Sequence, residues 1–293
     1  MKIYDCFMYF DEDMLLDIRL NILDKYVDKF VVIESKFLHS GREKKLNFNI
    51  DNFSKFKDKI IYLTVDQPPD GIEDIKDTDS IETSNKKKLD NSLKRENAQR
   101  NKLIHGIKEA NDEDLIISSD LDEIPNLENF KHNSKISIFL QEVFYYKFNL
   151  KQPDMTWYGT RICKKKDLIS FQWLRNIKSK KYPFWRLDCF FSKKKYHNID
   201  FIKNGGWHFT SIKDPKKIHF KLSNFMHHLE FEESGLSLLD MEKMVAEKKI
   251  LYDHNVDKKE KKYQGRQELI KFNEKLLPEY IVKNKKKYIN WFD

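Results

Sequence analysis

The first 125 residues alternate between short apolar runs and segments whose apolar positions have helical spacing. The apolar runs predict four strands, because continuous hydrophobic sequence is typical of strands that are buried on both faces. One polar stretch is poor in core residues and is expected to form a loop. The predicted elements are strand 2–10, helix 11–27, strands 30–33 and 59–65, loop 66–90, helix 91–110 and strand 114–119. This alternation favours a mostly parallel α/β sheet with helices on both faces.

The pattern changes after Pro125. Residues 135–148 predict one long or two short strands, and a region rich in Trp, Tyr and Lys follows to about Thr210. From Pro215 onward the spacing is helical again. No internal repeat or low-complexity linker divides the chain, so we expect one domain over residues 1–255, with halves 1–125 and 126–255. Residues 256–293 are expected to form a helical, basic C-terminal extension.

The amino-acid composition excludes several classes of protein. Of 293 residues, 40% are hydrophobic and 14% aromatic, too many for a disordered chain. With 35% charged residues and no apolar run of about 18, a membrane-embedded protein is excluded. The first residues do not resemble a signal peptide. The three cysteines are widely spaced, which argues against a disulfide scaffold or a zinc ribbon. We therefore expect a cytoplasmic, globular protein.

The net charge of +8 is unevenly distributed. Residues 161–221 contain 17 Lys or Arg and 4 Asp or Glu. Such a basic block suggests a polyanionic partner: a nucleic acid, a phosphorylated ligand or an anionic membrane surface. An alternative is compositional, because the chain has only three alanines and is rich in Lys, Asn, Ile and Phe. Lysines also keep a protein surface soluble.

The sharpest chemical feature is the segment from Ser119 to Pro125, which follows the last apolar strand of the first half. In extended chain Asp120 and Asp122 point the same way while Leu121 packs behind them. The carboxyl end of a parallel strand is where open α/β sheets bind ligands. Hard oxygen ligands suit Mn²⁺ or Mg²⁺ bridging a diphosphate. The alternative is a solvated acidic turn.

Three further segments carry polar groups in suggestive places. On helix 91–110, Glu96 and Arg100 could simply pair at i,i+4, whereas Arg95 could contact a phosphate. His208 follows a glycine pair and stands between two aromatic residues. It is either a buried core histidine or the completing ligand of a carboxylate metal site. The cluster of His227, His228 and Glu230 is most simply a solvated surface.

Several short motifs, in this order, give the chain its resemblance to a known family. They are Tyr4–Phe10, Asp17–Leu20, Val31–Ser35 with His39–Gly41, Glu96–Asn101, Ser119–Pro125, Trp157–Thr160, Gly206–Phe209 and Ser223–Glu230. Together they cover roughly residues 1–255. The chain resembles glycosyltransferase family 17, which includes the β-1,4-mannosyl-glycoprotein 4-β-N-acetylglucosaminyltransferases.

The resemblance implies a single domain of GT-A type, with a mostly parallel central sheet, a Rossmann-like first half and a helical C-terminal part. It implies inverting transfer of a sugar, with UDP-GlcNAc as the expected donor. Asp120 and Asp122 would coordinate Mn²⁺ or Mg²⁺, with His208 as a further ligand. The donor would be bound by Asp120 and by residues that fall close to it in the family's pattern: Glu34, Arg95, Glu96 and Arg100.

The acceptor is less constrained by the resemblance. The chain lacks the N-terminal membrane anchor of the animal members, so we expect a surface-polysaccharide precursor or lipid-linked saccharide rather than a finished glycoprotein. The basic face could hold the enzyme at the inner face of an anionic membrane. An acceptor hydroxyl must lose its proton as it attacks, which calls for a carboxylate base. Asp188 and Glu230 are the two candidates in the second half, with Asp188 weakly preferred.

Two other functions fit parts of the sequence. A haloacid-dehalogenase-like phosphatase also has an apolar strand followed by D-x-D, with the first Asp as nucleophile. That motif usually opens the chain, and here more than a hundred residues precede it. A nucleic-acid or anionic-surface binding protein could use the aromatic residues and lysines of 161–221. It leaves the D-x-D pair unexplained, and no nucleic acid is expected as partner.

Overall fold

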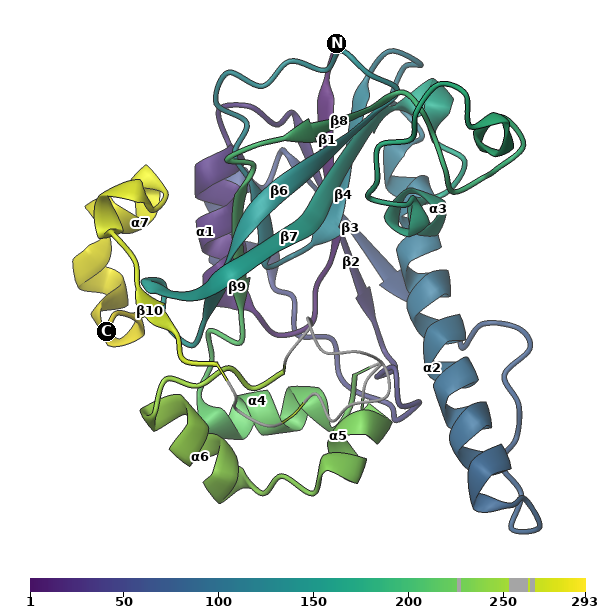
Figure 1. The fold of residues 1–293 in the computed structure, drawn as a ribbon, viewed down its shortest axis with the longest axis vertical. Coiled ribbons are helices and arrows are strands. Elements are labelled where there is room, and N and C mark those ends of the chain that lie inside the picture. The colour runs from purple at the N-terminus through teal and green to yellow at the C-terminus, as the bar shows by residue number, and fades with distance from the viewer. Residues whose placement is uncertain (226–227, 253–262, 264–266) are drawn as a thin grey trace.

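The computed structural model covers residues 1–293 and describes all of them except 226–227, 253–262 and 264–266. Its centre is a ten-stranded sheet in the order β3-β2-β1-β4-β7-β6-β9-β5, with β8 paired to β6 and β10 paired to β7 (Figure 1). The strands are β1 (Ile3–Met8), β2 (Lys29–Ser35), β3 (Ile60–Val65), β4 (Leu115–Asp120), β5 (Glu123–Pro125), β6 (Ile136–Tyr145), β7 (Leu150–Lys164), β8 (Ile199–Ile202), β9 (Gly206–Thr210) and β10 (Ile270–Lys271).

Helices surround this sheet. The α-helices are α1 (Asp13–Leu23), α2 (Ile81–Lys102), α3 (Phe171–Asn176), α4 (Pro215–Leu222), α5 (His228–Ser234), α6 (Leu238–Ala246) and α7 (Glu279–Lys283). Short 3-10 helices are η1 (Ile50–Phe56), η2 (Leu103–Ile107), η3 (Lys165–Asp167), η4 (Leu187–Cys189), η5 (Glu274–Leu276) and η6 (Lys285–Trp291). Among the residues described, no helix has the length and apolar character that a bilayer span requires.

The four predicted strands of the first half are confirmed, and they pair in parallel as β3-β2-β1-β4. Alternate side chains of each strand enter different cores, as a sheet covered on both faces requires. Phe7 and Val32 pack in the cluster that contains α1, whereas Cys6 and Val31 pack against η2 on the other face. This parallel part is the scaffold that carries the acidic turn.

The expectation of a mostly parallel sheet is wrong for the second half, where the sheet is mixed. β7 runs antiparallel to both of its neighbours, β4 and β6, and β5 runs antiparallel to β9. Only residues 146–149 connect β6 to β7, and so short a connection cannot make the crossover that parallel pairing needs. β8 and β9 return in parallel with β6.

The predicted loop 66–90 and helix 91–110 are displaced in the structure. Helix α2 already begins at Ile81, capped by Ser80, whose hydroxyl accepts from the amide of Thr83. It gives way at Leu103 to η2. The early start was missed because α2 has no continuous apolar stripe, and its first half extends past the sheet (Figure 1).

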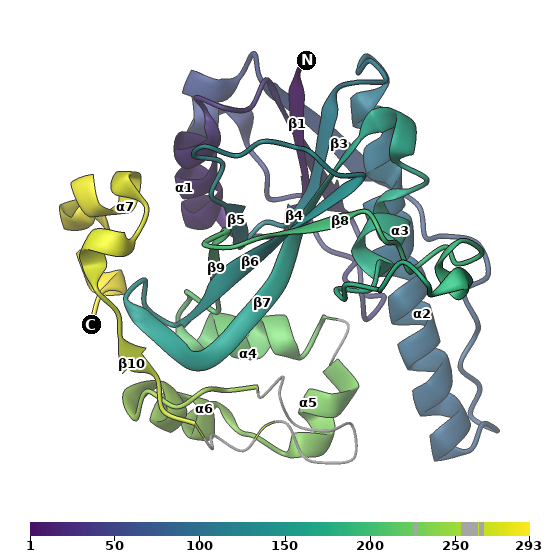
Figure 2. The same cartoon turned by 45° about the horizontal axis from the view of Figure 1, so that its top comes forward.

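The helical character predicted after Pro215 is confirmed in α4 to α7. Of the predicted extension 256–293, residues 256–262 and 264–266 lie outside the described part. The described remainder adds β10 to the sheet edge at β7 and places α7 beside α1 (Figure 2). Ile281 and Tyr288 are buried in the same core as Phe7. This segment is therefore packed into the main core.

Candidate active site

A cavity of about 310 Å³ lies at the carboxyl ends of the parallel strands. Its size falls in the range of small-molecule sites. The wall combines charged groups near the end of β4 with aromatic and aliphatic groups from the second half. The charged and imidazole residues in the wall are Glu12, His39, Lys44, Glu96, Arg100, Asp120, Asp122, His208 and Lys221. The cavity thus occupies the edge where the sequence predicted ligand binding.

The acidic turn after β4 is held from behind by Arg19 of α1. The Arg19 guanidinium is fully buried and donates to the backbone carbonyls of Asp120, Leu121 and Glu123, at 3.0, 3.1 and 2.8 Å. It also forms a buried ion pair with Asp5 at 2.6 Å. These bonds fix the path of the turn, and both predicted aspartates line the cavity while Leu121 is buried.

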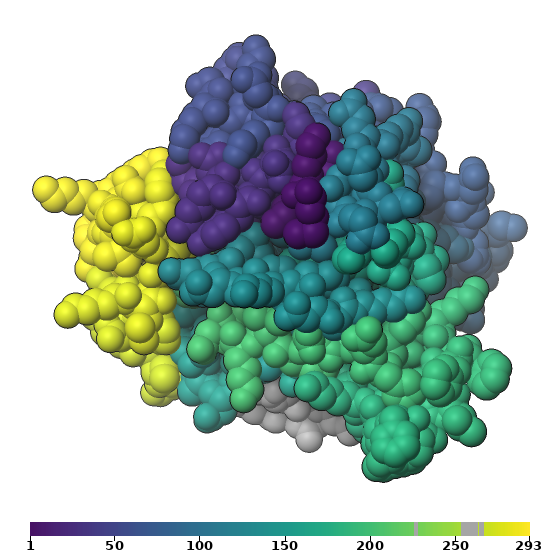
Figure 3. All heavy atoms as spheres, turned by 90° about the horizontal axis from the view of Figure 1, so that it is seen from above, coloured from purple at the N-terminus to yellow at the C-terminus, as the bar shows by residue number. Residues whose placement is uncertain are grey.

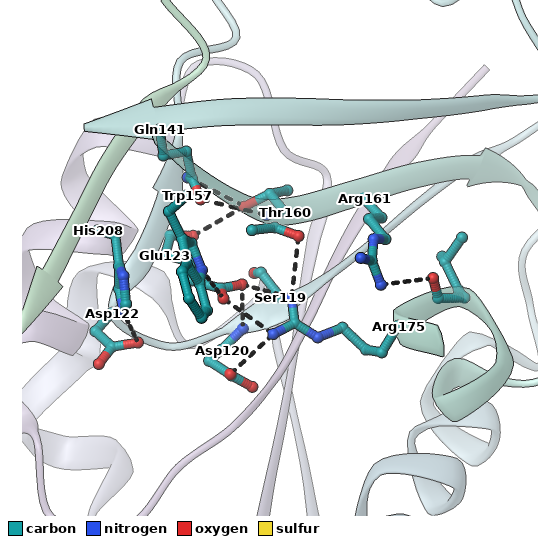
Figure 4. Close-up of polar contacts among 12 residues, drawn as sticks. Ser119, Asp120, Asp122, Glu123, Gln141, Trp157, Thr160, Arg161, Arg175 and His208 are labelled. Carbon is teal, nitrogen blue, oxygen red and sulfur yellow. Dashed lines mark hydrogen bonds and ion pairs between the residues drawn. The ribbon is translucent and has the colours of Figure 1, made fainter. Parts of the chain in front are cut away.

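Asp120 lies between two arginines. Its carboxylate accepts from Arg100 Nη1 at 2.8 Å. It also accepts from Arg175 Nη2 at 3.0 Å, the contact drawn in Figure 4. Burial alone would raise the pKa of Asp120, but Arg175 and Arg100 hold it far below its usual range. Arg100 also pairs with Glu96 at 2.7 Å, which is the predicted i,i+4 contact. Glu96 lines the cavity as well, and its role in donor binding stays a prediction.

Glu123 is a member of this network that the sequence reasoning did not single out. Its buried carboxylate accepts from Arg175 at 2.7 and 2.9 Å and from the Trp157 indole at 2.6 Å. It also accepts from the backbone amide of Asp120 at 3.0 Å. Glu123 thereby orients the Arg175 side chain and the start of the turn together. Its place in the same acidic turn as Asp120 was the available signal.

Asp122 lines the same cavity as Asp120 but has different partners, which come from β9 and α4. Its Oδ1 lies 3.6 Å from His208 Nε2, and its Oδ2 lies 3.9 Å from Lys221 Nζ. The antiparallel pairing of β5 with β9, which sets Glu123 opposite His208, brings the imidazole to the turn. Burial would lower the pKa of His208, but Asp122 raises it above its ordinary value. The His208 ring stacks on Trp157 with centroids 4.9 Å apart.

A second carboxylate, Glu12, lines this side of the cavity and is paired with two lysines. Glu12 accepts from Lys213 at 3.1 Å and from Lys221 at 3.3 Å. Burial would raise its pKa, but the two lysines lower it to about 2. None of these three was predicted from the sequence. The two lysines were part of the basic block, yet nothing local distinguished them from the other lysines in it.

Two residues that were predicted to bind the nucleotide-sugar donor make hydrogen bonds within the protein that stabilise its fold. The buried carboxylate of Glu34 accepts from the amides of Asn47 and Phe48, the Tyr62 hydroxyl and the Lys44 ammonium. Arg95 donates to the carbonyl of His39 at 3.1 Å. Neither Glu34 nor Arg95 is among the described residues that line the cavity. Their role in donor binding stays a prediction.

The two predicted bases lie in different surroundings. Asp188, in η4, pairs with Arg186 and Lys195, both at 2.7 Å, and is not among the described residues in the cavity wall. Glu230, in α5, accepts from the Tyr252 hydroxyl at 3.1 Å, and Tyr252 does line the cavity. Glu230 is itself not among the described wall residues, but it contacts one of them, whereas Asp188 is paired with two cations that flank η4. The catalytic base stays a prediction.

The carboxylate and imidazole groups near the turn suit a divalent cation whose coordination shell is completed by a bound substrate. No preformed group of three His, Cys, Asp or Glu metal ligands occurs within the described ranges. Asp122 and His208 nevertheless offer a carboxylate and an imidazole side by side, and the buried Nδ1 of His208 has no hydrogen-bond partner. Mg²⁺ is commonly held by one or two carboxylates plus substrate phosphates, and Mn²⁺ accepts the same kind of site.

The parallel strands of this mixed sheet end at a cavity whose wall contains carboxylates, an arginine and two lysines. This arrangement is that of the α/β proteins that bind ligands at the carboxyl edge of the sheet. A family model described as Glycosyltransferase family 17 matches residues 1–160, more than half of the chain. The chain therefore belongs to glycosyltransferase family 17. The matched range includes the acidic turn, Arg19, Arg100 and Trp157. No curated protein matches the chain.

Proposed function

We propose that this chain is a metal-dependent, inverting glycosyltransferase of GT-A type. It would move a sugar, GlcNAc from UDP-GlcNAc, onto a hydroxyl of a glycan or lipid-linked polysaccharide precursor. Family membership supports the transferase class. The observation that carries the proposal is the Asp120–Asp122 turn at the carboxyl end of β4, beside a cavity that also presents cations.

The donor diphosphate would lie against this turn. Asp122 and His208, with Asp120, would hold Mn²⁺ or Mg²⁺, and the bound cation would supply Lewis-acid stabilisation of the departing diphosphate. Arg100 and Lys221 line the same cavity and would add charge-assisted hydrogen bonds to phosphate oxygens. In the free protein these two cations are paired with Asp120 and Glu12, which keeps them positioned.

The acceptor would enter from the side formed by the second half. There the wall contains the rings of Trp157, Tyr145 and Tyr252, and sugar faces pack well on aromatic rings. Glu230, bonded to the Tyr252 hydroxyl, would accept the proton of the attacking acceptor hydroxyl. Attack from the face opposite the diphosphate would invert the anomeric carbon.

The test is calorimetric binding of UDP-GlcNAc, UDP-Glc, UDP-Gal and GDP-Man, with and without Mn²⁺. We expect one UDP-sugar to bind with Mn²⁺ and to lose at least about tenfold in affinity in Asp122→Asn. The matched control is Asp58→Asn. Asp58 is exposed and precedes β3, at the end of the parallel strands opposite to the cavity, so this variant should bind as the wild type does. If none of the nucleotide sugars bound with metal present, the donor assignment would be wrong.

A further inference from the structure

The basic block is not uniform in the structure, because one part of it exposes a cluster of large apolar side chains. Five such residues lie within eight positions around η4. They are Phe184, Trp185, Leu187, Phe190 and Phe191, with exposed fractions of 82, 65, 69, 70 and 90%. Exposed large apolar side chains elsewhere in the described chain are more scattered along the sequence. We call residues 184–191 the aromatic tip.

The aromatic tip is held out from the body of the protein by a structured base. The segment follows α3 and loops away from the sheet (Figure 1). The Lys178 amide donates to the Lys194 carbonyl at 2.8 Å, and the Trp173 indole donates to the Lys193 carbonyl at 2.7 Å. Cys189, within the tip, is buried. Because both ends of this segment are fixed in this way, its apolar side chains can meet a partner at little further cost in conformational entropy.

The flanks of the aromatic tip are strongly basic. Between Lys178 and Lys195 the chain has seven Lys or Arg residues and a single acid, Asp188. The Asp188 carboxylate is already paired with Arg186 and Lys195. The five remaining lysines, at 178, 180, 181, 193 and 194, are all exposed. In the space-filling view this part of the chain, in green, forms a projecting corner of the molecule (Figure 3).

We propose that residues 178–195 form a docking site for an anionic lipid bilayer. Aromatic and aliphatic side chains gain free energy by entering the boundary between headgroups and acyl chains. Surrounding lysines are attracted to anionic headgroups over about a Debye length. Trp, Phe and Leu next to Lys and Arg are typical of protein surfaces that lie in the membrane interface. The same combination would be costly on a surface that met only water.

This inference rests on the aromatic tip and its charges and is independent of the proposed transferase activity. It also gives Asp188 a structural role, because the Asp188 carboxylate joins Arg186, within the tip, to Lys195 of the flank that follows. The segment begins directly after α3, the helix that carries Arg175 to the acidic turn.

The test is co-sedimentation of the full chain with phosphatidylcholine vesicles, with and without phosphatidylglycerol. We expect binding to the anionic vesicles to be at least about tenfold stronger. The triple variant Phe184→Ser/Trp185→Ser/Phe191→Ser should lose this binding. The matched control, Ile81→Ser/Leu239→Ser/Leu276→Ser, removes three exposed apolar side chains from other surfaces and should bind as the wild type does.

A spectroscopic measurement reports insertion directly. Lipids brominated on the acyl chain should quench part of the tryptophan emission, and Trp185→Phe should remove that part. Equal binding to neutral and anionic vesicles, or unchanged binding of the triple serine variant, would overturn the proposal. So would sedimentation velocity showing that the aromatic tip joins two copies of this chain while vesicles bind neither form.

Discussion

At the scale of single residues, the acidic turn depends on a buried arginine that never reaches the cavity wall. Arg19 satisfies three carbonyls of the turn and the carboxylate of Asp5 at once. A buried charge is tolerated only when it is paired and hydrogen-bonded. The chemistry of Asp120 and Asp122 is therefore prepared by groups that lie behind them.

Replacing Arg19 should show this dependence as a loss of stability. Arg19→Met would leave the Asp5 carboxylate and three carbonyls buried without their donor, and we expect about 3–5 kcal/mol less free energy of unfolding. Lys25→Met, at an exposed position just after α1, should change it by less than about 0.5 kcal/mol. Urea unfolding measures both. A loss no larger than that of the control would contradict the proposed role of Arg19.

Single substitutions can also decide which of the two predicted residues, Glu230 or Asp188, is the catalytic base. Glu230→Gln should lower kcat by about 100-fold or more while donor affinity stays within about twofold, because a base acts only on the reacting hydroxyl. Asp188→Asn should leave kcat near the wild-type value. Steady-state kinetics with calorimetric donor binding separate the two effects. The opposite pattern, with Asp188 essential and Glu230 dispensable, would restore the preference drawn from the sequence.

At the scale of elements, the site is assembled where separate elements converge on the end of β4. α2 supplies Arg100, α3 supplies Arg175, β9 supplies His208 and α4 supplies Lys221. The α3 and α4 contributions neutralise carboxylates of the first half. These contacts join the parallel part of the sheet to the segments that follow it, so the electrostatics of the site also stabilise the packing of its elements.

The ion pairs of Glu12, the N-cap residue of α1, with Lys213 and with Lys221 of α4 give a pH dependence with a definite sign. The pKa of Glu12 falls from its ordinary value to about 2 in the folded protein, because Lys213 and Lys221 outweigh its burial. A depressed carboxyl pKa stabilises the folded state above the unfolded value of about 4.3, and that contribution is lost as pH falls toward 2. Glu12→Gln should therefore be less stable than the wild type at neutral pH, with the difference shrinking below about pH 4.

Chemical unfolding at several pH values between neutrality and about pH 3 would check this difference. Glu232→Gln, at an exposed position in α5, serves as the control and should follow the wild type throughout. A difference between Glu12→Gln and the wild type that grew toward acid would show that burial, rather than the two lysines, dominates at this carboxyl.

At the scale of the whole molecule, the two ends of the chain share one core. β10 extends the sheet at β7, and α7 lies beside α1. Ile281 is fully buried in the cluster that contains Phe7 of the first strand. Residues contributed from both ends to one contiguous core favour unfolding in a single cooperative transition.

Two neighbouring positions of α7 provide a matched comparison for this shared core. Ile281→Ala should lower the free energy of unfolding by about 2–5 kcal/mol, since it leaves a cavity in the core. Val282→Ala, whose side chain is 38% exposed, should cost clearly less. Thermal melts followed by far-UV and near-UV circular dichroism should show one transition in each variant. Loss of α7 signal well before the sheet melts would contradict a single core.

The sequence by itself determined the four buried strands of the first half and the acidic turn that ends β4, because these depend on local apolar runs and on alternation along one strand. It could not determine the antiparallel β7, since nothing in its side-chain pattern specifies the strands beside which it lies. The polar α2 lacked the stripe that marks a helix start.

Only the tertiary structure decided which charges meet. Arg175 reaches Asp120 from 55 positions away, and Lys221 reaches Glu12 from 209 positions away. Such pairs depend on how α3 and α4 pack on the sheet, which no local periodicity encodes. The same holds for the aromatic tip, whose residues resemble core in sequence and are exposed in the fold. Local hydrophobic pattern fixes the element, whereas long-range packing decides which side chains it buries, pairs or presents.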